Sequence, residues 1–570
     1  MTTAPQPTLT ERVFSAAAWN TMLFPVKFVF GLIANVLMLA YLHPSEYGIF
    51  ILITGLAATV GLYSDLGIER SLPRFIPEVE NQEGRAGVAR FLRRIISIKL
   101  VLVLAFVLGI QLFTTSLLNY VITNEQTSIA TAETELADLR ERGAPADEIV
   151  AAQTDLNGRR GAVEQLEDSG RLFLWAVCAL AFFGAIYDVF MQYLTAYFKQ
   201  RAWNIITAVV TLLQPLLIIM FIALNMRLGG VLLGIVITPV IAVALAAWQT
   251  LRASRELAPT VVDAQPDPTM PRRFVGFAGM SFLTQMTTWF YDLAFVVIVL
   301  TAAGTSLANI AILGFAYTFA KTFLSYAYLP FGGLLTPLLT RIRNRNEAAA
   351  LQETYGSMTR MFALILIPAG VGLALLTPRL LGLLYPQYVD ADNLAYVLIG
   401  FAFLESLLSI PHNVLMVYDR YRAVLFARLL ALMVVPLLLI VAQFEQPEQV
   451  LMGVAIAVGV ARVLPRLVTL IVVRRTMRLY FPVRFLGRVL LAVLAFCIPL
   501  LLLQQVWPLP ADTTTWADKA LAATSLGALA TLVGIGYLVA LRLLGGLDEQ
   551  ERKRILGLKL PFKRVLAKVL

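Results

Sequence analysis

Charged side chains inside long apolar segments are the residues of this sequence that could do chemistry. Lys27, Lys321 and Arg462 fall near the middle of such segments, as do Asp188 and Glu405. A charge at the centre of a bilayer costs at least about 2.5–3.5 kcal/mol, so such residues usually face a cavity or a partner. The three cations therefore line a cavity that binds an anion, pair with an acidic residue of another helix, or extend toward the membrane surface.

A second group of charged residues lies nearer the ends of the apolar segments. Arg70 and Arg74 are weaker candidates for a substrate pathway, because an arginine at the cytoplasmic end of a helix is usually an interfacial anchor. Asp65 lies near the same end, and Asp292 lies nearer the opposite one. These carboxylates, together with the two acidic residues named above, would bind a coupling proton or cation or pair with a neighbouring group.

The sequence lacks the motifs of an enzyme that uses ATP or a metal. It has no glycine-rich phosphate loop, and its two histidines, His43 and His412, are too few for a metal-binding cluster. It also has no basic patch interleaved with the aromatic residues on which nucleotide bases stack. We therefore expect no enzyme activity, no metal, no cofactor and no nucleic-acid partner.

The composition indicates what surrounds these charges. Of 570 residues, 59% are hydrophobic and only 14% are charged, whereas about a quarter are charged in a soluble domain. A transmembrane helix needs about 20 mostly apolar residues, and segments of that length recur throughout the chain. We predict an all-α polytopic membrane protein with about fourteen transmembrane helices. These helices are expected near residues 14–41, 47–70, 96–121, 172–197, 203–224, 231–251, 274–300, 309–329, 358–376, 394–417, 423–441, 451–473, 489–506 and 521–543.

Loop lengths divide the predicted helices into groups. A linker rich in Pro and Asp, residues 258–270, separates two sets of six helices of similar size. This pattern indicates a duplicated six-helix unit followed by two appended helices. The predicted parts are an N-terminal six-helix bundle at 1–123 and 171–257, a hairpin at 124–170, a C-terminal six-helix bundle at 271–480, two additional helices at 481–545, and a basic amphipathic tail at 546–570.

Basic residues are concentrated on one side of the predicted membrane. The net charge is +10, and the short loops on the side of the termini contain most of the loop arginines, among them Arg93, Arg94, Arg272 and Arg273. The positive-inside rule then places both termini on the cytoplasmic side of the plasma (inner) membrane. The basic tail is expected to lie on the anionic lipids of the inner leaflet.

Residues 124–170 interrupt the series of apolar segments. Apolar residues at heptad-like spacing on either side of a turn at Gly143 and Pro145 predict an antiparallel helical hairpin outside the membrane. Eleven acidic and five basic residues from Asn124 to Arg171 give this hairpin a net charge of −6. The hairpin is either a solvated insertion or a surface that contacts a second copy, the cell wall or envelope-biosynthesis proteins.

Three motifs near the start of the chain resemble those of a known family. The segment LHPSEYGIF from Leu42 to Phe50, and the motifs DLG at Asp65 and RFIPE at Arg74, resemble the opening of polysaccharide flippases. These flippases are part of the multidrug/oligosaccharidyl-lipid/polysaccharide exporter superfamily. The resemblance continues more loosely at Gly314–Tyr317, Leu380–Gly382 and Tyr388. It departs at the hairpin and at His43, where a glycine is usual.

The resemblance implies a fold and a function. The fold would be two six-helix bundles around a central cavity that opens alternately to each side of the membrane. The substrate would be an oligosaccharide on an undecaprenyl-type diphosphate lipid, flipped during polysaccharide biosynthesis, and cations from both halves would suit its diphosphate. A peptidoglycan-precursor flippase and a drug/cation antiporter have the same architecture, and a membrane polysaccharide polymerase or ligase is the alternative from another class.

Overall fold

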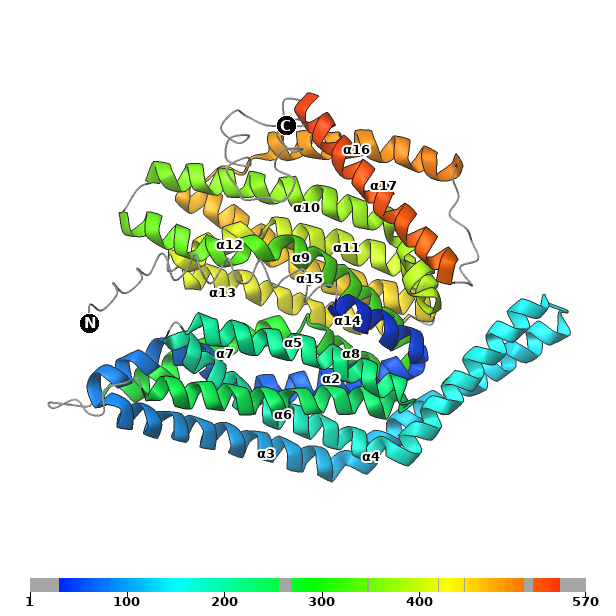
Figure 1. Ribbon diagram of the computed structural model, residues 1–570, viewed down its shortest axis with the longest axis horizontal. Helices are drawn as coiled ribbons and strands as arrows, with labels where there is room; N and C mark the ends of the chain where they lie inside the picture. Colours follow the sequence, from blue (N-terminus) through cyan, green and yellow to red (C-terminus); the bar gives the residue numbers. More distant parts are fainter. Residues whose placement is uncertain are drawn as a thin grey trace. The chain divides into compact units, whose positions relative to one another are not determined.

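The structure is a computed structural model that describes residues 30–197, 199–255, 268–345, 348–418, 420–444, 446–506 and 516–543 (Figure 1). Throughout these ranges the regular secondary structure is helical, and no strand occurs in them. Eight helical segments within them are long and apolar enough to cross a membrane. A bent pair of helices makes a ninth. The prediction of an all-α polytopic membrane protein is therefore confirmed.

The described part of the chain forms two compact units. Unit 1 comprises Met1–Gly314 and Val435–Leu451, and unit 2 comprises Phe315–Val434 and Met452–Leu570. The predicted bundles divide at the linker 258–270, whereas the compact units divide at Gly314. The helices that follow this linker therefore pack with unit 1. The linker itself lies mostly outside the described residues, and the proposed duplication stays a prediction.

Unit 1 contains the helices that follow one another from the first described residue. They are a helix at Phe30–Tyr41, α2 (Pro44–Asp65), α3 (Ile68–Glu141), α4 (Ala146–Ala196), α5 (Gln200–Ala223), α6 (Arg227–Ser254), α7 (Met270–Trp289), α8 (Leu293–Ala302) and the start of α9 (Leu307–Arg345). Helix α14 (Val434–Val441) and the start of α15 (Pro447–Met477) complete it.

Unit 2 contains the remainder of α9 and α15 and the helices near them in the chain. They are α10 (Ala348–Leu384), the 3-10 helix η1 (Pro386–Ala391), α11 (Asp392–Leu407), α12 (Ser409–Val417), α13 (Tyr421–Leu429), the 3-10 helix η2 (Leu430–Met433), α16 (Val483–Val506) and α17 (Trp516–Leu543). The predicted eighth, thirteenth and fourteenth spans lie within α9, α16 and α17, and α9 continues to Arg345, well beyond the predicted end at residue 329.

The start of α3 shows how an apolar stripe packs a helix in unit 1. Ile68, Leu72, Phe75, Ile76 and Val79 are all buried and follow the three- and four-residue spacing of one helix face. They form a core with side chains of α4, α5, α6 and α7. This packing fixes the end of α2 and the start of α3, where several charged residues lie.

The predicted second and seventh spans differ from the observed helices. The second span was expected to run to Arg70, but α2 ends at Asp65 because Leu66 and Gly67 both have positive φ angles. The seventh span was expected to be one helix, but α7 and α8 meet at an angle of 56°. The side chain of Asp292 accepts a hydrogen bond from the backbone N–H of Ala294 and so caps α8 at the bend.

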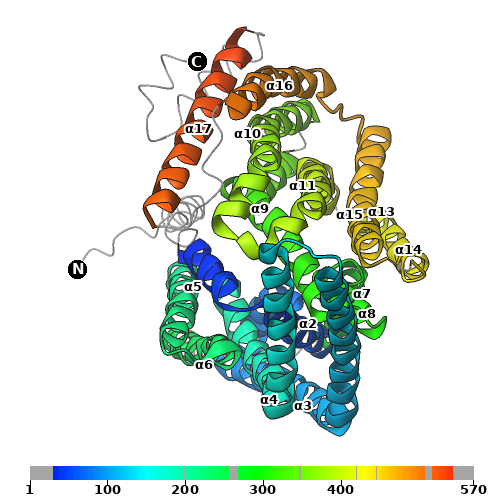
Figure 2. The ribbon, with the colours of Figure 1, turned by 90° about the vertical axis from the view of Figure 1, so that its right-hand side faces the viewer.

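The predicted pair of antiparallel helices at 124–170 is present, and its location outside the membrane stays a prediction. The end of α3 and the start of α4 run side by side and project beyond the other helices of unit 1 (Figures 1 and 2). Leu136, Leu139, Leu156, Val163 and Leu166 are buried between them, as the heptad-like spacing predicted. Both helices continue without a break into predicted transmembrane spans.

Candidate anion-binding cavity and buried ion pairs

A cavity of about 210 Å³ lies inside unit 2, between α9, α11, α12 and α15. Its lining includes Lys321 from α9, Glu405 from α11, and Arg462 and Arg466 from α15. Arg462 and Arg466 are four residues apart on one helix, so their side chains lie on the same face. The cavity thus brings together three charged residues that the sequence analysis selected, with one more arginine.

Glu405 holds the two arginines of the cavity. Its Oε2 atom accepts a hydrogen bond of 2.6 Å from Nε of Arg462. Its Oε1 atom lies 3.7 Å from Nη2 of Arg466. About a fifth of the Glu405 side chain is exposed, so this ion pair is partly shielded from water. The pairing that the sequence analysis left open for Arg462 is therefore present, and Arg462 lines the cavity as well.

Tyr317 connects the remaining cation to this pair. Its hydroxyl accepts a hydrogen bond from Nη1 of Arg462. Its ring centroid lies 5.2 Å from Cζ of Arg462 and 5.4 Å from Nζ of Lys321. A cation over an aromatic ring is stabilised by about 0.5–2 kcal/mol. One aromatic ring therefore positions two of the three basic side chains.

The charges that line the cavity do not cancel. Three basic residues and one acidic residue leave a formal excess of two positive charges. Lys321 and the two arginines all attract the carboxylate of Glu405, which is the one acidic residue among the described residues that line the cavity. In a setting of low dielectric such an excess attracts an anion. Guanidinium groups in particular match the geometry of phosphate oxygens.

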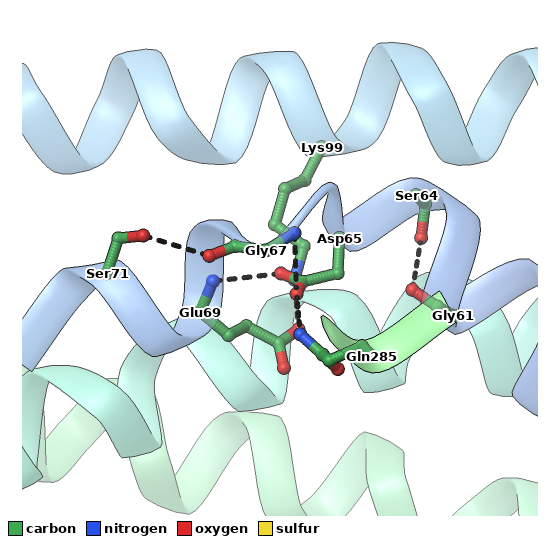
Figure 3. Close-up of polar contacts among 8 residues, drawn as sticks. All are labelled: Gly61, Ser64, Asp65, Gly67, Glu69, Ser71, Lys99 and Gln285. Carbon is green, nitrogen blue, oxygen red and sulfur yellow. Dashed lines mark hydrogen bonds and ion pairs between the residues drawn. The ribbon is translucent and has the colours of Figure 1, made fainter. Parts of the chain in front are cut away.

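Unit 1 contains a different arrangement, in which carboxylates surround one buried lysine. Lys99 is only 1% exposed, and its Nζ atom lies 3.4 Å from Oδ1 of Asp65 and also binds Glu69 (Figure 3). Asp65 accepts further hydrogen bonds from the backbone N–H of Gly67 and Glu69 and from the side chain of Gln285 in α7. Asp65 therefore fixes both the turn between α2 and α3 and the packing of α7.

Asp188 of α4 adds a third carboxylate to this cluster. It interacts electrostatically with Lys99 and with Asp65. Together with Glu69, the cluster places three carboxyl groups around a single lysine. Within the described residues, no group of three or more His, Cys, Asp or Glu side chains has the geometry of a metal site.

The other predicted residues lie elsewhere. Lys27 is outside the described residues. Arg70 and Arg74 are exposed at the start of α3, where the guanidinium of Arg74 lies 5.1 Å from the ring centroid of Phe277. Asp292 caps α8, as described above, so its carboxylate has a structural role at the bend.

Two basic residues of these sites were not identified from the sequence. Arg466 follows the selected Arg462 by one helical turn, and that spacing was the signal that could have found it. Lys99 lies near the start of a predicted span, where a lysine normally extends its amine to the membrane surface. Its burial depends on the turn at Gly67, which directs Asp65 toward it and which the sequence pattern did not predict.

Comparisons with known proteins support the fold. No family model matches the sequence, and no curated protein matches it. The solved structure of "Lipid II flippase MurJ, inward closed conformation" is similar with a TM-score of 0.60 and 15% identity, over 92% of this chain and 99% of that chain. An inward-facing "multidrug resistance MATE family transporter of the MOP superfamily" is similar with a TM-score of 0.50 and 14% identity, over 81% of this chain and 98% of that chain. The chain therefore shares the polytopic helical fold of these two solved transporters.

Proposed function

We propose that this chain is a flippase that moves a lipid-linked oligosaccharide across the plasma membrane by alternating access, during polysaccharide biosynthesis. The lipid carrier would be of the undecaprenyl-diphosphate type. The observation that carries the proposal is the cavity of unit 2, in which Lys321, Arg462 and Arg466 outnumber Glu405. A diphosphate is the part of such a substrate that has negative charge, and these cations would bind it.

The size of the cavity indicates which part of the substrate it would hold. Pockets that enclose a drug-sized ligand have volumes of about 300–1,000 Å³, and this one has about 210 Å³. A volume of that size suits a phosphate group or a diphosphate better than a whole oligosaccharide. We infer that the cations hold the diphosphate while the glycan and the lipid extend outside this cavity.

The alternatives make different predictions about charge and chemistry. A drug/cation antiporter would need a site that attracts a cation, which the positive excess of this cavity opposes. A peptidoglycan-precursor flippase would use the same diphosphate-binding residues, and the similarity to a lipid II flippase favours it as the second candidate. The motifs near Leu42 and Asp65 resemble those of polysaccharide flippases, so a lipid-linked oligosaccharide is preferred over the peptidoglycan precursor as the candidate substrate.

The proposed transporter has a defined orientation in the membrane and catalyses no reaction itself. Both termini would be cytoplasmic, the hairpin would be outside, and the substrate would enter from the side of the termini. The chain would carry out no covalent chemistry itself, in contrast to a polymerase or ligase. Binding of envelope-biosynthesis proteins to the hairpin stays a prediction.

Deletion of the gene tests the proposed function in cells. Without the flippase, lipid-linked glycan accumulates on the inner leaflet, and the surface polysaccharide decreases. The analysis of lipid extracts by mass spectrometry would identify which glycan accumulates and would separate an oligosaccharide from the peptidoglycan precursor. Normal surface polysaccharide together with unchanged lipid intermediates would contradict the proposal, and accumulation of unpolymerised repeats on the outer leaflet would favour a polymerase.

A further inference from the structure

The base of the hairpin binds the turn between α8 and α9 within unit 1. We call residues 120–125 of α3 and 155–165 of α4 the hairpin base, and residues 301–307 the α8–α9 turn. The hydroxyl of Tyr120 donates a hydrogen bond of 2.7 Å to the carbonyl oxygen of Ala302. The amide of Asn124 donates one of 3.5 Å to the carbonyl oxygen of Thr301. Both contacts satisfy carbonyl groups at the C-terminal end of α8.

A buried carboxylate of the hairpin base binds the other end of this turn. Oε2 of Glu125 accepts a hydrogen bond of 2.9 Å from the backbone N–H of Leu307, the first residue of α9. Glu125 is 1% exposed, and its negative charge at the N-terminus of a helix is favourable. Burial raises the pKa of Glu125, and the hydrogen bond from Leu307 and the charge of Arg159 offset only part of that rise. The hairpin base therefore holds both α8 and α9.

The other helix of the hairpin base contacts the start of α2. Nε2 of His43 lies 3.5 Å from Oδ1 of Asp155, while Nδ1 of the same ring accepts a hydrogen bond from the backbone N–H of Ser45. Burial lowers the pKa of His43, so the ring is neutral at neutral pH and has its proton on Nε2. The imidazole packs so closely on Gly158 that a Cβ atom there would lie 2.2 Å from it.

Glu46 adds a second link between α2 and the hairpin. Its Oε1 atom accepts a hydrogen bond from the side chain of Gln165, and its Oε2 atom accepts one from the backbone N–H of His43. This glutamate is part of the capping box of α2. The hairpin base thus binds the N-terminal end of α2 as well as the α8–α9 turn.

Helix α2 and the start of α9 also touch each other directly. A Cβ atom on Gly48 would lie 2.1 Å from the carbonyl oxygen of Leu307, so only a glycine permits this approach. The first turn of α8 packs on Gly55 of α2. A Cβ atom on Gly55 would lie 3.4 Å from Cα of Ala294. The hairpin base therefore covers a place where α2, α8 and α9 meet closely.

We infer that the hairpin base is a latch that holds the hairpin side of the transporter closed. The inference rests on the proposed alternating access of two six-helix bundles. In that scheme α2 is part of the first bundle, and α8 and α9 are part of the second. Opening on the hairpin side separates these helices, and the hydrogen bonds of Tyr120, Asn124 and Glu125 to the α8–α9 turn oppose that separation. The substrate leaves only after the latch releases the turn.

The test measures how often α8 separates from α2. Ala294 is buried at 5% exposure and faces Gly55, so a cysteine at this position reacts with a maleimide only when the helices part. The reporter Ala294→Cys is introduced into a full-length chain in which Cys178 and Cys497 are replaced by alanine. The labelling rate is then measured on purified protein in lipid nanodiscs, with and without a change in the latch.

Glu125→Ala should increase the labelling rate about tenfold, the factor expected when one hydrogen bond to a charged acceptor no longer holds the closed state. Tyr120→Phe removes a single exposed hydroxyl and leaves the fold intact, and it should give a smaller increase of about threefold. Arg140→Ala is the matched control, because Arg140 binds Gln153 near the tip of the same hairpin. It should leave the rate unchanged.

Equal labelling rates in Glu125→Ala, Tyr120→Phe and the control would overturn the inference. The readout requires no substrate, so its failure is distinct from a failure of the proposed function. Faster labelling in a protein that moves no lipid would support the latch and contradict the flippase. Unchanged labelling in a protein that does move the lipid would contradict the latch and support the flippase.

Discussion

Nε of Arg462 lies 2.6 Å from Oε2 of Glu405, so an acidic residue orients a guanidinium that lines the cavity of unit 2. The other carboxylate oxygen lies near Arg466, and Tyr317 contacts both Arg462 and Lys321. The basic groups are therefore arranged before an anion arrives. Such preorganisation reduces the entropy that binding would otherwise cost.

Lys321→Ala should abolish export of the glycan without lowering the amount of protein in the membrane. The side chain is exposed to the cavity, so its loss removes a cation without leaving a buried gap. The measurement compares surface polysaccharide with the membrane level of the protein on an immunoblot. Lys321→Arg keeps the charge and should retain part of the activity. Full export in Lys321→Ala would remove this lysine from the pathway.

Arg466→Ala should weaken the binding of undecaprenyl diphosphate by about tenfold, because a charge-assisted hydrogen bond contributes about 1.5 kcal/mol or more. Binding is measured by calorimetry on purified protein in detergent. Arg475→Ala is the matched control, since Arg475 is on the same helix α15 but is exposed. If both variants bind the lipid equally well, Arg466 is not part of the phosphate site.

Lys99→Ala should destabilise unit 1 strongly. The lysine is buried among Asp65, Glu69 and Asp188, and removing one partner of a buried pair costs about 3–5 kcal/mol because a charge remains unpaired. Thermal unfolding of the purified protein measures the effect as a lower midpoint. Arg70→Ala, which removes an exposed cation nearby, should change the midpoint little. A midpoint for Lys99→Ala equal to that of the wild type would show that the cluster contributes no stability.

A cysteine at the tip of the hairpin should be labelled from outside the cell. Ala144→Cys is placed in the turn between α3 and α4, which the positive-inside rule predicts to be extracytoplasmic. A membrane-impermeant maleimide added to intact cells should react with it and should not react with Arg475→Cys until the cells are opened. The reverse pattern would invert the proposed orientation.

Three of the four charged residues that line the cavity were predictable because charge is costly in an apolar segment. Lys321, Arg462 and Glu405 were selected on that ground, and the structure brings them to one cavity. The hairpin was predictable from spacing, since its buried leucines repeat at the positions of a two-helix seam. In both cases a local pattern along the chain was sufficient.

Other features depend on backbone geometry and packing that the pattern does not contain. The coupling role of Asp292 stays a prediction. The structure adds that Asp292 caps α8, because α7 and α8 bend at a position where the apolar run continues. The contact of Lys99 with Asp65 depends on the positive φ angles of Leu66 and Gly67. The hydrogen bond of Glu125 to Leu307 joins residues far apart in sequence, and no periodicity could reveal it.

The central claim is that this chain moves a lipid-linked oligosaccharide by means of the cations of unit 2. The most direct measurement uses proteoliposomes that contain undecaprenyl-diphosphate-linked oligosaccharide, with a glycosidase added outside to detect glycans that reach the outer leaflet. We predict that the wild-type protein speeds this transfer over protein-free liposomes, and that the double variant Lys321→Ala/Arg466→Ala does not. Transfer by the wild type no faster than in protein-free liposomes, or equal transfer by the double variant, would contradict the account.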